Sequence, residues 1–133
     1  MGISPHHVGL TVEDIDRAKA WYADAFGFAP QLEFELPAGV RGAMLRTEDG
    51  ARIELFEVPG SEPGLKRADP PLAMRTTGFG HVGLESSDLD AAFAQATAAG
   101  GVAVWEPRQS PEPGLRMAFV HDPDGNLIEL IGV

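Results

Sequence analysis

The sequence predicts an α+β fold made of two tandem βαβββ modules, and this prediction depends on an internal repeat. The same short motifs occur twice, in the same order, with one residue of drift between the first match and the last. Three matches in one order indicate a duplicated module. The matching segments are HVGL at 7–10 and 81–84, DIDRA at 14–18 with DLDAA at 88–92, and DGARIEL at 49–55 with DGNLIEL at 124–130.

Each module is expected to begin with a strand and to continue with a helix. Asp14 and Asp88 are candidate N-caps, because a carboxylate accepts hydrogen bonds from the free amides of a helix's first turn. Gly27 and Gly100 then provide helix stops. Strands are expected at about 5–12, 30–36, 42–47 and 51–58, and again at about 80–86, 102–106, 115–121 and 126–132, with Asp-Gly turns at 49–50 and 124–125.

We expect residues 1–133 to form a single domain, because domains usually contain about 100–200 residues. Module one covers about 1–60 and module two about 78–133. The connection between them, about 59–77, is rich in proline, glycine and charged residues. A connection of this length is either a plain linker or a loop with a function, such as a lid.

Composition and charge exclude several classes of protein. The chain contains no cysteine, which excludes disulfides, zinc–thiolate sites and cysteine nucleophiles. Its net charge of −10 disfavours nucleic acid or an anionic membrane as the partner, because both attract clustered positive charge. No apolar stretch approaches the ~20 residues of a membrane-spanning helix, and the first residues lack the features of a signal peptide. We therefore expect a cytoplasmic protein.

The repeat places one histidine and one glutamate at corresponding positions of each module. These are His7 and Glu54 in module one, and His81 and Glu129 in module two. Because side chains alternate between the two faces of a strand, their apolar neighbours point toward the helix and these four share the other face. Imidazole and carboxylate groups suit one divalent metal ion such as zinc, nickel, cobalt, manganese or iron. His6 has the opposite parity and no counterpart in the repeat.

Taken singly, a strand histidine is more often a hydrogen-bonded structural residue, and a strand glutamate is usually solvated. The recurrence of both types on one face of both modules favours the metal site. Four longer segments are spread along nearly the whole chain: HVGLTVEDIDRAKAWYADAFGF, RIELFE, HVGLESSDLDAA and DPDGNLIEL. In these segments the chain resembles the vicinal oxygen chelate superfamily. This superfamily includes glyoxalase I, methylmalonyl-CoA epimerase, extradiol dioxygenases, and the bleomycin and fosfomycin resistance proteins.

The resemblance implies that the modules form a curled mixed sheet, the glyoxalase/bleomycin resistance/dioxygenase fold, which makes a cup around a metal. It also implies a metal-dependent isomerase, lyase or epimerase acting on a small substrate that chelates the metal through two neighbouring oxygens. Glyoxalase I has the pattern His, Glu, His, Glu, and the chain has all four at His7, Glu54, His81 and Glu129. By this resemblance Glu129, or else Glu54, is the catalytic base that moves a proton between substrate carbons.

Two alternatives remain open from the sequence. Extradiol dioxygenases bind Fe(II) with two histidines and one glutamate, which would match His7, His81 and Glu129 and leave Glu54 as an additional carboxylate. The other alternative is a non-catalytic binding protein of the bleomycin-resistance type, although such members lack the metal ligands.

Several further residues are candidates for substrate contact. They lie on expected strands that could line the cup: Arg46, Phe56, Trp105, Phe119 and His121. The partners expected are therefore a small-molecule substrate and a second copy of the chain. A homodimer is expected because two modules leave exposed sheet edges that a partner could cover. The metal site then lies within one chain or is shared across the dimer.

Overall fold

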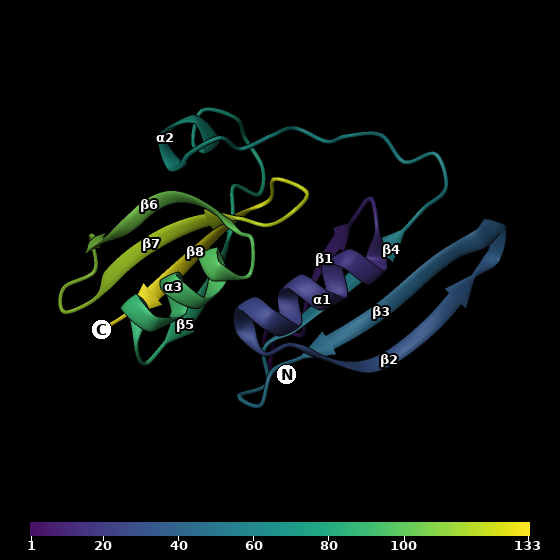
Figure 1. The fold of residues 1–133 in the computed structure, drawn as a ribbon, viewed down its shortest axis with the longest axis horizontal. Helices are drawn as coiled ribbons and strands as arrows, with labels where there is room; N and C mark the ends of the chain where they lie inside the picture. The colour runs from purple at the N-terminus through teal and green to yellow at the C-terminus, as the bar shows by residue number, and fades with distance from the viewer. The chain divides into compact units, whose positions relative to one another are not determined.

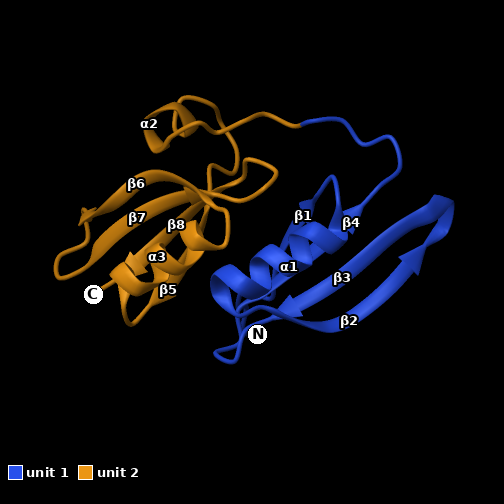
Figure 2. Cartoon of the chain, viewed as in Figure 1, with its two compact units in different colours: residues 1–63 blue, residues 64–133 orange.

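The computed structural model describes residues 1–133, and the chain folds into two compact units. The first unit contains residues 1–63 and the second contains residues 64–133 (Figure 2). Each unit has one four-stranded mixed sheet and one longer helix (Figure 1), which confirms the α+β fold of two βαβββ modules. None of the helices combines the length and the apolar character needed to cross a membrane.

The sheet of the first unit has the strand order β1-β4-β3-β2. β1 and β4 are parallel, whereas β4, β3 and β2 follow one another in antiparallel pairs. The helix α1 connects the first two strands and packs against β2, β3 and β4. The elements are β1 at Val8–Thr11, α1 at Ile15–Phe26, β2 at Ala29–Leu36, a short 3-10 turn at Pro37–Gly39, β3 at Val40–Arg46 and β4 at Arg52–Glu57.

Both ends of α1 have the local chemistry that the sequence predicts. The carboxylate of Asp14 accepts a hydrogen bond from the amide of Arg17 at 3.0 Å, so it caps the helix. Glu57 of β4 accepts from the amide of Ile15, also at 3.0 Å, which ties the helix start to the sheet. At the other end Gly27 has a φ of 74°, the left-handed conformation that glycine adopts at low cost.

The buried face of α1 determines which side of the sheet is left open. Its buried residues pack against one face of β3 and β4, where alternate residues are fully covered. Because neighbouring residues of a strand point to opposite faces, the residues between those buried ones lie on the other face. The buried residues are Ile15, Ala18, Trp21, Tyr22 and Ala25 of α1, and Ala43, Leu45, Ile53 and Leu55 of the sheet.

The second unit repeats this arrangement, with the strand order β5-β8-β7-β6 and β5 parallel to β8. Asp88 caps α3 by accepting from the amide of Ala91 at 3.0 Å, as predicted. Leu89 and Ala96 of α3 are buried together with Ala118 and Val120 of β7 and with Ile128 and Leu130 of β8. The elements are α2 at Pro70–Ala73, β5 at Val82–Ser86, α3 at Leu89–Ala98, β6 at Val102–Gln109, β7 at Arg116–His121 and β8 at Leu127–Gly132.

Several strand boundaries differ from the sequence prediction, and β3 begins at Val40 instead of about 42. β1 and β5 begin later than expected, because their first ladder partners are Ile53 and Ile128, so both candidate histidines precede their strands by one residue. β6 continues through Pro107 to Gln109, beyond the predicted end at 106. Proline is tolerated there because β6 is an edge strand, and the register is irregular between Trp105 and Arg108.

The connection after residue 63 is folded onto the second sheet. Asp69 caps the short helix α2, and Ala73 of that helix packs against Phe119 and Leu127. Arg67 donates to the carbonyl of Ala73 at 3.0 Å and to that of Thr76 at 3.4 Å. Residues 64–77 therefore belong structurally to the second unit and do not form a free linker.

Candidate metal centre

In the first unit the structure brings His7 and Glu54 together. The Nε2 of His7 lies 3.3 Å from Oε1 of Glu54, and both side chains are partly exposed, at 34% and 22%. Glu54 is on the sheet face opposite α1, because its neighbours Ile53 and Leu55 are buried under that helix. The predicted parity of this pair agrees with the geometry.

His6 lies beside this pair without joining it. Its Nδ1 is 2.7 Å from Nδ1 of His7, and the two rings meet edge to face. His7, and not His6, makes the contact with Glu54. The register inferred from the repeat therefore selects the histidine that reaches the carboxylate.

The second unit holds the equivalent pair. The Nε2 of His81 is 3.0 Å from Oε2 of Glu129, within hydrogen-bonding distance, and the side chains are 38% and 19% exposed. The ring of Phe119 meets the ring of His81 edge to face, with centroids 5.4 Å apart. Phe119 is also the register partner of Glu129, so the carboxylate is next to an aromatic side chain.

Glycines keep space free beside both glutamates. Gly9 is the register partner of Glu54, and Gly83 is the register partner of Glu129. A methyl group added at Gly9 would meet nothing within 4 Å, and at Gly83 the nearest atom would be Oε2 of Glu129 at 3.7 Å. Each His–Glu pair therefore has open space on its strand neighbour for a ligand.

The donor chemistry of the pairs fits a divalent ion, but each unit supplies only two ligands. Neither unit contains a group of three or more His, Asp or Glu residues that could hold a metal by itself. Two imidazole nitrogens and two carboxylates are together a suitable set for a four-coordinate N/O site. The structure therefore shows two similar His–Glu pairs, and the joint binding of one ion, with each pair as a half-site, remains a prediction.

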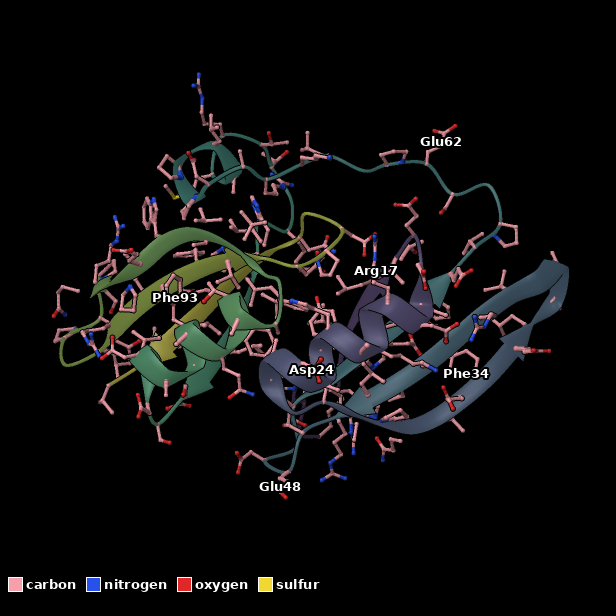
Figure 3. The ribbon with its side chains drawn as sticks, in the orientation of Figure 1. Arg17, Asp24, Phe34, Glu48, Glu62 and Phe93 are labelled. Atoms are coloured by element: carbon pink, nitrogen blue, oxygen red, sulfur yellow. The ribbon has the colours of Figure 1, made fainter.

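Aromatic side chains flank the half-site of the first unit. Phe34 and Gly42 are register partners, and so are Gly42 and Phe56. The ring of Phe34 lies over Gly42, so a methyl group there would meet the ring at 2.2 Å, and it meets the ring of Phe56 with centroids 5.9 Å apart. Figure 3 labels Phe34 on the β2–β3 ribbon. The predicted Phe56 is on the Glu54 face, and Phe34 packs against it there.

The second unit carries a different set of side chains on the Glu129 face. Trp105 meets Phe119 edge to face at 5.6 Å, and the guanidinium carbon of Arg108 lies 4.4 Å from the centre of the Trp105 ring. Phe119 is only 3% exposed, because α2 covers it. The Nε2 of His121 is 2.7 Å from the carbonyl oxygen of Arg67. The histidine is thus engaged in holding the 64–77 segment.

Two cations that lie on the helix side of the sheets are used in ion pairs. Arg41 forms a two-point pair with Asp16 of α1, and its hydrogen bond lowers the pKa of that carboxyl group. Arg116 forms the equivalent pair with Asp90 of α3 and lowers the pKa of Asp90 in the same way. These arginines fasten helix to sheet, because charge-assisted bidentate pairs have a fixed geometry.

Comparison with known proteins decides the family. A family model described as the Glyoxalase/Bleomycin resistance protein/Dioxygenase superfamily matches residues 4–130. The chain belongs to this superfamily. The match covers both units and therefore includes both His–Glu pairs.

Individual relatives are distant but similar over most of this chain. A 2-epi-5-epi-valiolone epimerase from Actinomyces sp is 28% identical over 98% of this chain and 80% of its own length. A probable lactoylglutathione lyase from Synechocystis sp. is 29% identical over 94% of this chain and 92% of its own. The crystal structure of glyoxalase I from Zea mays superposes with a TM-score of 0.77 at 25% identity, over 96% of this chain. This chain spans only 44% of the length of that maize enzyme.

Proposed function

We propose that this chain is a divalent-metal-dependent isomerase, lyase or epimerase of the glyoxalase type. The observation that supports it most directly is the repeated His–Glu pair, with nitrogen-to-oxygen distances of 3.3 Å and 3.0 Å on equivalent sheet faces. Relatives named as an epimerase and a lyase support the same class of reaction. The proposed substrate is a small molecule with two neighbouring oxygens.

The metal ligands proposed are His7, Glu54, His81 and Glu129. A zinc, nickel, cobalt or manganese ion held by these side chains would supply Lewis acidity toward the substrate oxygens. In the proposed site the two imidazoles act only as fixed nitrogen donors, because nothing in the reaction requires them to exchange protons. The two carboxylates differ in their surroundings, and this difference supports the choice of one of them as the base.

Glu129 is the proposed base. A carboxylate that lies near a substrate C–H bond takes the proton from one carbon and returns it to the neighbouring carbon. Glu129 is the less exposed carboxylate, at 19%, and it lies between Gly83 and the aromatic Phe119 in the register of the sheet. Gly83 leaves room for a substrate beside it, and Phe119 limits the access of water. Glu54 is the alternative base, at 22% exposure beside Gly9.

The structure gives the dioxygenase alternative no additional support. A ring-cleaving enzyme would leave Glu54 outside the ligand set, whereas here Glu54 contacts His7 as Glu129 contacts His81. His121, the further histidine expected on an inner strand, has its Nε2 engaged with the carbonyl of Arg67. We therefore propose the glyoxalase-type reaction alone.

Metal analysis tests the proposal directly. Protein purified without chelators should contain close to one divalent ion per chain, measured by inductively coupled plasma mass spectrometry. His7→Ala and His81→Ala should each lose most of that metal, because each removes one of four ligands. His6→Ala should retain it, since His6 makes no contact with either glutamate. No bound metal in the parent protein, or equal losses in His6→Ala and His7→Ala, would contradict the proposed site.

Mixing variants decides whether two half-sites combine within one chain or between two chains of the proposed homodimer. His7→Ala and His81→Ala chains should be unfolded together and refolded as a mixture. If the site is shared between two chains, a mixed dimer contains one intact site and one doubly altered site, so metal content recovers in part. If the site lies within one chain, every site lacks one histidine ligand and the metal content does not recover. Light scattering on the parent protein measures the dimer itself.

A further inference from the structure

Two arginines lie directly opposite each other at one end of the first unit's sheet. Arg46, the last residue of β3, is the register partner of Arg52, the first residue of β4. Their neighbours Leu45 and Ile53 are buried on the α1 side. Alternation along the strands therefore places both arginines on the face that carries Glu54. Figure 3 labels Glu48 in the loop that joins these two strands.

Neither guanidinium group has a partner in the structure. No hydrogen bond or ion pair satisfies either one, and the Nε of Arg52 is buried without an acceptor. A buried N–H without an acceptor is rare in proteins and requires an explanation. Like charges placed directly opposite across two strands also repel each other. This corner of the sheet therefore has two cationic groups and unused donors that the fold does not satisfy.

Two other strand arginines of the chain do bind carboxylates. The chain has 20 acidic residues and 10 Lys and Arg, so carboxylate partners are plentiful. Arg41 and Arg116 each take an aspartate of a helix, Asp16 and Asp90, as a two-point partner. The arginines at the β3–β4 corner take none. Their missing partner has the chemistry of an oxyanion, because guanidinium groups bind carboxylate and phosphate oxygens in a fork geometry.

We propose that Arg46 and Arg52 together bind an anionic group of the substrate, a carboxylate or a phosphate. This proposal rests on the proposed function, because it assigns the substrate class of the same site. Arg52 is two residues from Glu54 on the same strand face, a separation of about 7 Å. It also lies next to His7 in the register, since Val8 pairs with Ile53. The substrate is then a small molecule that carries a carboxylate or a phosphate in addition to its metal-binding oxygens.

Side-chain NMR on the metal-free full chain tests the assignment without any enzymatic activity. The Nε–H resonance of Arg52 is followed while inorganic phosphate or acetate is added at constant ionic strength. A saturable shift with either probe is expected, and the probe that binds more tightly tells whether the substrate group is a phosphate or a carboxylate. No saturable shift with either probe would overturn the proposal.

Variants then assign the binding to the two arginines. Arg46→Gln should raise the dissociation constant at least about tenfold, the effect of losing one charge-assisted hydrogen bond. Arg46 is exposed, so this variant should fold normally even if Arg52→Gln does not. Lys66→Gln removes one exposed positive charge elsewhere and serves as the matched control. Equal dissociation constants for Arg46→Gln and Lys66→Gln would show that the anion binds by general charge alone, which would overturn the proposal.

The histidine variant separates this proposal from the proposed function. His81→Ala, which removes a proposed metal ligand of the other unit, should leave the anion titration of the metal-free protein unchanged, because the arginines provide the donors. Loss of anion binding in His81→Ala would contradict the assignment to the arginines. Failure of the metal analysis with a normal titration would refute the metal-dependent reaction and leave the anion site in place.

Discussion

Replacing Asp122 by alanine should destabilise the chain more than the matched change in the first unit. Asp122 is 3% exposed, and its carboxylate accepts three hydrogen bonds within the turn between β7 and β8. The donors are the amide of Asp124 at 2.9 Å, the amide of Asn126 at 2.8 Å and the side-chain amide of Asn126 at 2.8 Å. The side chain therefore holds together the turn that sets the start of β8, the strand that carries Glu129.

Thr47 is the equivalent residue of the first unit, and the backbone around it is the same. The amide of Gly50 donates to the carbonyl of Thr47 at 3.1 Å, and that of Gly125 donates to Asp122 at 3.0 Å. The side chain of Thr47 accepts only one hydrogen bond in its turn, from the amide of Ala51 at 3.1 Å. Thr47→Ala is therefore a control that removes one acceptor from an otherwise similar turn.

The expected magnitude follows from the number and charge of these bonds. A hydrogen bond to a charged group contributes about 1.5–3 kcal/mol, so three bonds set an upper limit of roughly 9 kcal/mol. The turn is only half-buried, so water replaces part of this loss, and we expect about 3 kcal/mol for Asp122→Ala. Thr47→Ala removes one neutral bond and should cost about 1 kcal/mol. For a chain of this size, about 3 kcal/mol corresponds to a fall in Tm of roughly 10 °C.

Urea unfolding followed by circular dichroism measures the difference. The loss of stability in Asp122→Asn should lie between the losses in Asp122→Ala and Thr47→Ala. The asparagine keeps one oxygen acceptor but turns an NH2 group toward the donating side chain of Asn126. Amide hydrogen exchange at Asp124 and Asn126 shows whether the loss is local to the turn. Equal unfolding midpoints for Asp122→Ala and Thr47→Ala would refute the reasoning.

Three further predictions test the packing, backbone and electrostatics. Gly132→Ala should lower the free energy of unfolding by about 2 kcal/mol, because the new methyl would lie 1.9 Å from the carbonyl oxygen of Ser86; an unchanged urea midpoint would contradict it. Ala38→Gly should raise that free energy by about 0.5 kcal/mol, because Ala38 has a φ of 67° that glycine adopts more readily; a lower midpoint would argue against this strain. Arg116→Gln removes the hydrogen bond that lowers the pKa of Asp90 below its ordinary value of 3.8. Because the pKa of Asp90 is lower in the folded state, its ion pair stabilises the fold at pH values above 3.8. This stabilisation disappears as the pH falls through the lowered pKa of the folded state. The variant should therefore be slightly less stable than the parent near pH 7 and equally stable in acid. A difference that persists at pH 2 would point to a non-electrostatic cause.

Repetition made much of the architecture predictable. Each helix cap could be predicted because Asp14 and Asp88 precede matching helical patterns, and both accept the expected hydrogen bond. The face on which Glu54 lies could be predicted because Ile53 and Leu55 alternate with it along the strand, and these aliphatic residues are fully buried. Local periodicity needs no knowledge of the tertiary structure, which is why these predictions succeeded.

Non-local pairing explains what the sequence did not show. The length of β6 depends on its position at the sheet edge, where Pro107 interrupts no ladder on the solvent side. The packing of Ala73 on Phe119 depends on where the connection returns across the sheet. Neither relation leaves a periodic signal, because both join segments that are far apart in the chain.

The site divides in the same way. The sequence alone determined which four residues are candidate ligands, because duplication marks His7, Glu54, His81 and Glu129 at matching places. Only the tertiary structure decided that each histidine contacts the glutamate of its own unit, at 3.3 Å and 3.0 Å. It also placed Arg52 opposite Arg46 with no acceptor for its Nε, because cross-strand register follows from the folded sheet and not from the order of residues.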